Sequence, residues 1–334
     1  MPRVSVVIPV RNEERWLGEC LDSVLAALES VGGGEVLVVD GQSEDGTAEV
    51  IARYRDRHAG IELIPNPRKV TPAGFNLGIR RARSDAIAIV SAHSRLESDF
   101  FEAALRRLDR GDADIVGGPV RTEASGDGAL SWLLARIVSH PFGVGNSRFR
   151  VSSREAYVDA VPFAVFRREV FERVGAFDEE LVRNQDTEFF GRVRSAGLRV
   201  LLDPSVRSVY RARGTLGGLL RQGFLSAYWN VLVWRRNPAA FQWRHAVPAA
   251  FALSLLVAAV GTILVPRGWV LLAAVLAAYL VAASLATADV IRRTGRATAL
   301  LLPPLFLVYH VSYGAGSVAG LSWLWARRAS RGYG

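Results

Sequence analysis

Ser5–Glu14 (SVVIPVRNEE) and Val38–Thr47 (VVDGQSEDGT) are the two stretches of this sequence that determine its fold. Each begins with β-branched and other apolar residues that predict a buried strand, and each continues into polar residues that begin a helix. The first strand ends at Pro9, with Glu13 in the turn behind it, and the second strand ends at Asp40. A carboxylate therefore follows each of two successive strands.

The same alternation of strands and helices continues as far as Asp203. Further strands are predicted at Ile61–Pro65, Ala86–Ser91, Asp114–Val120, Val161–Arg167 and Arg199–Asp203. Helices are predicted at Glu13–Ser30, Thr71–Arg83, Asp99–Arg110, Arg168–Val174 and Asp186–Ser195, with another that begins near Gly46. This pattern predicts an α/β domain with βαβ units around a mixed, mostly parallel sheet. Ligands of such sheets bind at the carboxyl ends of the strands, where Asp40, Ser91 and His93 fall.

Three uncharged, apolar runs occupy the last third of the chain: Ala246–Val265, Trp269–Ala288 and Ala297–Leu324. About 20 apolar residues are enough for a helix to cross a bilayer core of ~30 Å. We therefore predict transmembrane helices, with Pro303-Pro304 as a possible break in the third run. Since Met1 leads directly into a strand and no cleavable signal peptide precedes it, we expect the first domain to lie on the cytoplasmic side.

The positive charge of the chain is concentrated beside these runs. Residues 205–244 hold seven arginines and no acid, and residues 245–334 hold seven arginines and one aspartate, whereas the whole chain carries +9. The first 204 residues are therefore net acidic. A basic belt next to transmembrane segments indicates contact with anionic lipids and not with nucleic acid. We assign no role to Lys69, the only lysine, and the single Cys20 excludes disulfides within the chain.

Leu216–Trp234 separates the α/β domain from the apolar runs. Its polar residues Gln222, Ser226 and Asn230 recur every four positions. With Trp229 among its aromatic residues, the segment is typical of a helix that lies in a membrane interface, although a buried domain helix remains the alternative. We predict an α/β domain at 1–214, a basic interfacial region at 215–244 and a transmembrane region at 245–334.

The order of these motifs resembles the inverting family-2 glycosyltransferases, which have the GT-A fold. Asn76-x-Gly78 is similar to the family's N-x-G helix, and Asn184-Gln185-Asp186 is similar to its acidic motif before the acceptor helix. The segments HPFGVGNSRFR and LLDPSVRSVYRAR look most like the succinoglycan-type exopolysaccharide branch. The resemblance covers about residues 3–235.

The resemblance implies a role for each matching residue. Asp186 corresponds to the catalytic base, which takes the proton of the acceptor hydroxyl. Asp40 would read uracil and Glu13 would lie near the ribose. The other residues expected to bind substrate are Pro9, Asn76, Ser91, Arg148, Asn184, Gln185, Gln222 and Trp229.

The metal motif departs from the family pattern. Where the family has Asp-x-Asp, this sequence reads Ser91-Ala92-His93. We expect a divalent cation, Mn²⁺ or Mg²⁺, with His93 as its protein ligand, because imidazole binds Mn²⁺ although hard cations prefer oxygen. A structural histidine is the alternative. In that case the arginine-rich loop around Arg148 and Arg154 would neutralise the diphosphate.

These features predict a multi-pass membrane enzyme with a cytoplasmic catalytic domain. It would move a sugar from a nucleoside diphosphate donor, a UDP-sugar by the Asp40 argument, to a lipid-linked acceptor in exopolysaccharide or cell-envelope glycan synthesis. A polyprenyl-phosphate monosaccharide synthase is an alternative with a different acceptor. A non-catalytic subunit that binds a nucleotide sugar is an alternative from another class.

Overall fold

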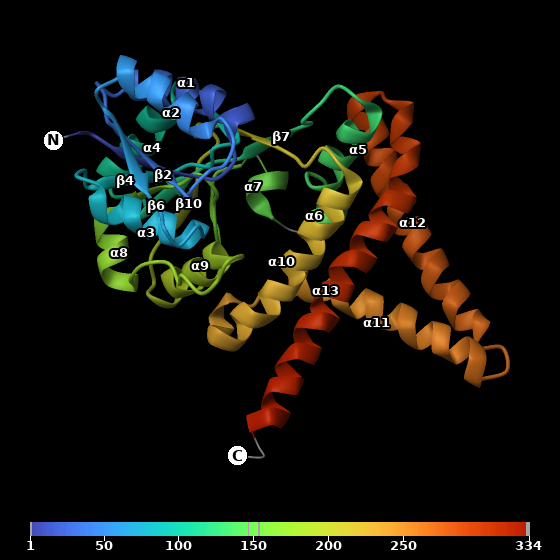
Figure 1. The fold of residues 1–334 in the computed structure, drawn as a ribbon. Helices are drawn as coiled ribbons and strands as arrows, with labels where there is room; N and C mark the ends of the chain where they lie inside the picture. Colours follow the sequence, from blue (N-terminus) through green and yellow to red (C-terminus); the bar gives the residue numbers. More distant parts are fainter. Residues whose placement is uncertain (1, 146, 153, 332–334) are drawn as a thin grey trace. The chain divides into compact units, whose positions relative to one another are not determined.

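The computed structural model describes residues 2–145, 147–152 and 154–331, and the side chains of these residues as far as Trp325. The chain forms two units (Figure 1), Met1–Arg121 with Arg148–Arg211, and Thr122–Ser147 with Ala212–Gly334. The boundary between Arg211 and Ala212 lies close to the predicted end of the first domain at residue 214. Residues 122–147 were predicted in the first domain but lie in the second unit, because the apolar side chains of this segment pack with those of the C-terminal helices.

The first unit is an α/β fold whose elements follow the predicted order. Its strands are β1 (Ser5–Val10), β2 (Glu35–Asp40), β3 (Ile61–Pro65), β4 (Ala86–Ile89), β5 (Ser94–Leu96), β6 (Ile115–Gly117), β7 (Val120–Glu123, which leads into the second unit), β8 (Ala156–Tyr157), β9 (Val165–Arg167), β10 (Val200–Leu202) and β11 (Ser208–Arg211). Its helices are α1 (Glu14–Glu29), α2 (Thr47–Arg57), α3 (Thr71–Arg81), α4 (Phe100–Asp109), α7 (Arg148–Val151), α8 (Arg168–Val174) and α9 (Gln185–Ser195).

The main sheet has the strand order β3-β2-β1-β4-β9-β6-β10-β8. Strands β1 to β4 are parallel to one another, as β6 is to β10, whereas β9 runs antiparallel to β4 and β6. The prediction of a mixed, mostly parallel sheet is therefore confirmed. Because β1 to β4 share one direction, their carboxyl ends meet at one edge of the sheet.

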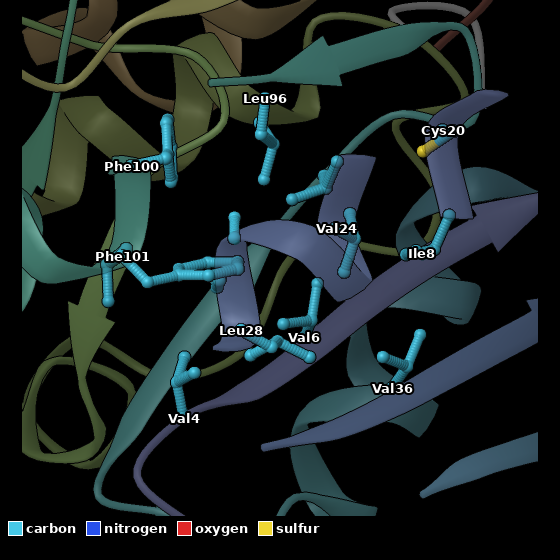
Figure 2. Packing of buried hydrophobic residues seen from close by; sticks show 14 of the residues in the cluster. Val4, Val6, Ile8, Cys20, Val24, Leu28, Val36, Leu96, Phe100 and Phe101 are labelled. Carbon is cyan, nitrogen blue, oxygen red and sulfur yellow. The ribbon is translucent and has the colours of Figure 1, made fainter. Parts of the chain in front are cut away.

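Apolar side chains fill both faces of this sheet. On one face, Val6 and Ile8 of β1 pack with Val24 of α1 and Phe101 of α4 in a fully buried cluster (Figure 2). Val7 points to the other face, as the two-residue period of a strand requires, and packs there in a second cluster. Burial on both faces explains why the strands read as continuous apolar runs.

Two predicted strands differ from those observed. Asp114–Val120 is interrupted, so that β6 ends at Gly117 and β7 begins at Val120. A Cβ added at Gly118 would lie 1.6 Å from the carbonyl oxygen of Val206, so the chain turns there against another backbone segment. Val161–Arg167 contributes only β9, because Phe163 adopts a left-handed backbone with φ of 48° before the strand begins.

The second unit is helical. It contains α5 (Ala129–Ile137), α6 (Pro141–Val144), α10 (Leu216–Arg236), η1 (Pro238–Ala240), α11 (Trp243–Leu264), α12 (Trp269–Thr294), η2 (Ala297–Leu301) and α13 (Leu302–Arg331). Among the described residues, three segments are long and apolar enough to cross a membrane: Trp243–Leu264, Trp269–Thr294 and Ala297–Trp325. Pro303 and Pro304 begin α13 and do not break it, since a proline in the first turn of a helix removes no backbone hydrogen bond.

Helix α10 packs along α13 within the second unit. Gly316 and Gly320 of α13 lie against the α10 backbone, where a Cβ at Gly316 would come within 2.1 Å of the carbonyl oxygen of Phe224. Asn230 is buried, and its Nδ2 donates a hydrogen bond to the Tyr313 hydroxyl at 2.8 Å. The predicted polar stripe of α10 is therefore not a continuous headgroup-facing surface, because its last member faces α13.

Candidate functional site

A cavity of about 320 Å³ lies at the carboxyl edge of the main sheet. The ends of the four parallel strands all contribute to its wall: Pro9 after β1, Gly41 after β2, Asn66 after β3 and Ser91 after β4. The position agrees with the rule for ligand sites of open α/β sheets. The cavity lies entirely within the first unit.

Six predicted site residues come together in this cavity. They are Pro9, Glu13, Ser91, His93, Gln185 and Asp186. Asp40, Asn76, Arg148 and Asn184 belong to the same unit but are not among the residues that line the cavity. Gln222 and Trp229 lie half-buried on α10 in the second unit and do not line it either. For the six predicted residues that do not line the cavity, direct contact with the substrate remains a prediction.

The two loops that follow β1 and β2 are tied together by hydrogen bonds. The backbone N–H of Asn12 donates to Ser43 Oγ at 3.0 Å, and the N–H of Glu13 donates to Thr47 Oγ1 at 2.9 Å. In return, the Glu44 N–H donates to Asn12 Oδ1 at 2.8 Å. The hydroxyl-rich sequence after β2 therefore fixes the backbone that presents Glu13 to the cavity.

Asp40 ends β2 next to the cavity, but its carboxylate is engaged locally. Its Oδ1 accepts hydrogen bonds from the Ser43 hydroxyl at 2.6 Å and from the Ser43 N–H at 3.2 Å. This arrangement shapes the turn that places Gly41 in the cavity wall. The second oxygen, Oδ2, also accepts from the Ser43 N–H at 3.3 Å. Base recognition by Asp40 remains a prediction.

His93 is held between Glu13 and Ser91. Its Nδ1 lies 3.2 Å from Glu13 Oε1, and the Ser91 hydroxyl lies 3.1 Å from its Nε2. The Tyr210 ring meets the imidazole edge-on, with ring centroids 5.5 Å apart. The ring is thus fixed from several sides, with a carboxylate beside it that the sequence alone did not place there.

The donor set beside His93 fits a divalent cation. Glu13 provides a carboxylate oxygen, His93 provides an imidazole nitrogen, and both side chains line the cavity. Within the described residues no three side chains of His, Cys, Asp or Glu converge, so the protein would offer two strong ligands. Oxygen atoms of a bound diphosphate are suited to complete such a shell.

Asp186 lies in the first turn of α9, with its carboxyl in the cavity. The N-cap of the helix is Asn184, which has a left-handed backbone with φ of 56°, so Asp186 is not itself the cap. Asp186 is exposed, with its carboxyl in the cavity, and desolvation by nearby protein atoms raises the pKa of the carboxyl. The Thr187 N–H, which donates to Oδ1 at 2.8 Å, and the charge of Arg150 act in the opposite direction.

Arg150 is the arginine of the 148–154 loop that acts on the site. Besides its charge on Asp186, its guanidinium lies 5.3 Å from the centre of the Tyr210 ring, which in turn contacts His93. The sequence drew attention to Arg148 in this loop, but Arg148 has no comparable contact among those described. Arg150 therefore influences Asp186 through its charge and contacts the Tyr210 ring beside His93, although Arg150 itself does not line the cavity.

Asn76 and Gly78 hold helix α3 in place beside the cavity. The amide of Asn76 is buried, donates to the carbonyl oxygen of Phe177 at 2.9 Å and accepts from the Phe177 N–H at 2.9 Å. A Cβ at Gly78 would lie 2.3 Å from Cγ1 of Val7, so only glycine lets α3 pack this closely on β1. The N-x-G motif thus holds α3 against the sheet and against Phe177, which lines the cavity.

Sequence reasoning missed several residues that line the cavity. Asn66 is buried with its Oδ1 unpaired, and Lys69 has a left-handed backbone with φ of 60°. Both follow β3, so the rule that sites form at the carboxyl ends of parallel strands would have indicated them. Phe163 and Phe190 also line the cavity, and no local signal distinguishes them from core residues.

The fold has relatives among solved structures. It is similar to "Mannosyltransferase PcManGT from Pyrobaculum calidifontis in complex with GDP-Man and Mn2+", with a TM-score of 0.59 and 22% identity over 93% of this chain and 87% of that chain. The GT-A fold expected from the sequence, a Rossmann-like mixed sheet followed by apolar helices, is therefore confirmed.

Sequence comparison adds two relatives. A Methanococcus voltae enzyme, dolichyl N-acetyl-alpha-D-glucosaminyl phosphate 3-beta-D-2,3-diacetamido-2,3-dideoxy-beta-D-glucuronosyltransferase, is 23% identical over 93% of this chain and 95% of its own length. Succinoglycan biosynthesis protein ExoA of Rhizobium meliloti (strain 1021) is 26% identical over 66% of each chain. Residues 5–175, about half of the chain, match the family described as Glycosyl transferase family 2. With the family match covering the sheet edge that forms the cavity, the chain belongs to glycosyl transferase family 2 and is a glycosyltransferase.

Proposed function

We propose that this glycosyltransferase inverts the anomeric centre while it moves a sugar from a nucleoside diphosphate donor, a UDP-sugar, to a lipid-linked acceptor. The observation that carries the proposal is the cavity itself. It brings the Asp186 carboxyl together with Glu13, Ser91 and His93 at the strand ends. A base and a group of residues suited to a diphosphate therefore face one space, as a single displacement requires.

Asp186 is the proposed base. Its carboxylate accepts the proton of the acceptor hydroxyl while that oxygen forms the bond to the anomeric carbon and the diphosphate leaves. One displacement needs one base, in contrast to glycoside hydrolases, which use a pair of carboxyl groups. The Thr187 N–H donates to one carboxylate oxygen of Asp186 at 2.8 Å and so helps to hold the carboxylate in place for the acceptor hydroxyl.

The strand-end residues are proposed to receive the diphosphate. Glu13 and His93 are the residues that would hold a divalent cation, which supplies positive charge to the leaving group when bound. Arg150 would supply positive charge between this group and Asp186. If the cation supplies more of the positive charge on the leaving group than Arg150 does, chelation by EDTA should abolish transfer. Mn²⁺ should then restore transfer better than Mg²⁺, because imidazole suits the softer ion.

The acceptor is proposed to be lipid-linked and the pathway to be exopolysaccharide or cell-envelope glycan synthesis. The names of the Methanococcus and Rhizobium relatives point to a dolichyl phosphate-linked sugar and to an exopolysaccharide, respectively. A succinoglycan-type branch is the finer assignment that we propose. Three apolar helices suit an enzyme whose acceptor is embedded in a bilayer.

We further propose that the catalytic domain is cytoplasmic. With that orientation the end of α12, with Arg292 and Arg293 in its last turn, and Arg296 in the connection to η2 lie on the cytoplasmic side, as the positive-inside rule favours. The arginines of residues 205–244 would then face anionic lipids. A fragment of residues 1–237 should bind acidic liposomes and be released by salt. Equal binding to neutral liposomes would contradict this role.

The decisive experiment is a transfer assay with purified protein in detergent, a panel of UDP- and GDP-sugars, and lipid extract as acceptor. Transfer from a UDP-sugar with inversion of the anomeric centre would support the proposal. Transfer to free polyprenyl phosphate would favour the monosaccharide synthase alternative. Tight nucleotide binding without any transfer would favour a non-catalytic subunit, and tighter binding of GDP than of UDP would refute the donor assignment.

A further inference from the structure

Arg136 on α5 is a half-buried cation whose neighbours supply no negative charge. Its Nη2 donates a hydrogen bond to the carbonyl oxygen of Thr122 at 3.2 Å, whereas its Nε is buried and has no hydrogen-bond partner among the described residues. Burial lowers the pKa of the Arg136 guanidinium, and so does the positive charge of Arg296. A buried charge is costly unless an opposite charge and hydrogen bonds accompany it. The protein groups described around Arg136 leave its charge unneutralised.

Arg296 lies beside the same tryptophan ring as Arg136. The guanidinium carbon of Arg136 is 5.7 Å from the centre of the Trp132 ring, and that of Arg296 is 5.3 Å from the same centre. Trp132 precedes Arg136 by one turn of α5, whereas Arg296 comes from the connection between α12 and η2, and α5 packs against η2. Two guanidiniums beside one ring repel each other, and an anion that contacts both would remove this repulsion.

The one acid of residues 245–334, Asp289, has other partners. Its carboxylate pairs with two arginines in the last turn of α12, and His140 Nε2 lies 3.4 Å from its Oδ2. His140 follows Arg136 by one turn of α5, so this contact also holds the Arg136 face of α5 beside the end of α12. Among the described ion pairs, Asp289 forms none with Arg136 or Arg296.

The two arginines lie where one membrane-length helix ends and the next begins. Arg296 falls between Trp269–Thr294 and Ala297–Trp325, the second and third segments that could cross a membrane. Leu300 and Leu301 of η2 follow it, with exposed fractions of 67% and 58%. A ligand at this place meets positive charge next to exposed apolar side chains. A lipid that carries a phosphate on hydrocarbon chains has the matching combination.

We infer that Arg136 and Arg296 bind the phosphate group of one membrane lipid, with Trp132 holding both guanidiniums in place. The fork of an arginine matches two oxygens of a phosphate, and hydrogen bonds between charged groups are roughly twice as strong as neutral ones. A bilayer phospholipid and a polyprenyl phosphate present the same oxygens to such a site. This lipid site goes beyond the proposed function, because it lies in the second unit and uses no residue of the cavity. It is also separate from the arginines of residues 205–244.

The test measures lipid binding to the full chain in detergent. Delipidated protein is titrated with phosphatidylglycerol, polyprenyl phosphate, diacylglycerol or inorganic phosphate, and the bound molecules are counted by native mass spectrometry. Wild type should bind one lipid phosphate about 10-fold or more tightly than diacylglycerol, which lacks the phosphate, and than inorganic phosphate, which lacks the chains. Arg136→Gln and Arg296→Gln should each weaken that binding about 10-fold or more, because each loses hydrogen bonds between charged groups. The lipid phosphate that binds more tightly identifies the source of the phosphate.

A matched variant and thermal unfolding make the result specific. Arg267→Gln removes an equal charge from the exposed connection between α11 and α12, at the other end of α12, and should bind lipid as wild type does. Without lipid, Arg136→Gln should unfold at the same temperature as wild type or higher, because it removes a half-buried charge that has no opposite partner. The lipid phosphate that wild type binds should raise the unfolding temperature of wild type and of Arg267→Gln, but not that of Arg136→Gln.

Three results would overturn the lipid site. They are an unchanged affinity for both lipid phosphates in Arg136→Gln and Arg296→Gln, an equal loss of affinity in Arg267→Gln, and binding of inorganic phosphate as tight as that of the lipids. Arg296 is exposed, so its variant reports on binding even if Arg136→Gln does not fold. Sugar transfer is measured separately, and its failure in wild type would count against the proposed function and not against the lipid site.

Discussion

Replacement of Asp186 by asparagine tests the proposed base with the smallest structural change. Asparagine keeps the size of the side chain, and its Oδ1 can still accept the Thr187 N–H that lies 2.8 Å from Asp186 Oδ1. Only proton acceptance is lost. A positioned base contributes about 10²–10⁴-fold to the rate, so kcat should fall by that factor, which corresponds to about 3–5 kcal/mol of activation free energy. The KM for the donor should change by less than about 3-fold, since uniform binding is kept.

The pH profile gives a second readout of the same residue. Asp186 acts as a base only when ionised, and desolvation raises its pKa above the ordinary value of about 3.9. The kcat of the wild type should therefore fall as the pH drops through this raised pKa, and Asp186→Asn should lack that acid limb. The folded state favours the protonated form, so the stability due to this group is present below the unfolded-state pKa and is lost as the pH rises through the raised value.

Asp186→Asn should accordingly unfold at the same or a higher temperature than wild type at neutral pH. The assay is steady-state transfer with the donor varied between pH 5 and 9, together with thermal unfolding. Asp56→Asn, on the exposed surface of α2, is the matched control and should behave as wild type. Turnover within about 3-fold of wild type, or an unchanged acid limb in the variant, would refute the assignment of the base.

Three other substitutions test the architecture. Gly78→Ala should cost about 1–3 kcal/mol of unfolding free energy, because its Cβ would lie 2.3 Å from Val7 Cγ1, and thermal unfolding measures the loss. Asp40→Ala should weaken UDP binding in calorimetry and also cost about 1 kcal/mol, because Ser43 loses its hydrogen-bond acceptor. Asn230→Ala should lower the unfolding temperature of the detergent-solubilised protein, since a buried bond between α10 and α13 worth about 1 kcal/mol is removed.

Matched controls separate these effects from general damage. Gly18→Ala adds a methyl group to α1 at an ordinary contact distance of 3.6 Å from the Tyr54 hydroxyl, and should leave the protein as stable as wild type or more so. An equal loss in Gly18→Ala and Gly78→Ala would contradict the close packing of α3 on β1. If the Asp40→Ala variant bound UDP normally, Asp40 would have no role in nucleotide binding and would only stabilise the turn after β2.

Local patterns in the sequence were sufficient for the architecture. Strand and helix periods predicted the α/β order, since apolar residues must face a core wherever the chain is regular. The carboxyl-edge rule predicted that Asp40, Ser91 and His93 lie together, and Ser91 and His93 line one cavity whereas Asp40 does not. Asp186, which was identified by its resemblance to the acidic motif of the family, lines the same cavity. Three apolar runs predicted three membrane-length helices, because length and composition alone decide that property.

Only the tertiary structure decided which side chains meet. Glu13 and His93 are 80 residues apart, and their contact depends on the pairing of β1 with β4 and on hydrogen bonds between two loops. Phe163 and Phe190 carry no local signal that distinguishes them from core residues, and only the tertiary structure brings them to the cavity. Residues 122–147 belong to the helical unit because their apolar side chains pack with those of α10, α12 and α13. A sequence specifies local conformation through short-range sterics and hydrogen bonds, whereas contacts between distant residues depend on how the whole core packs.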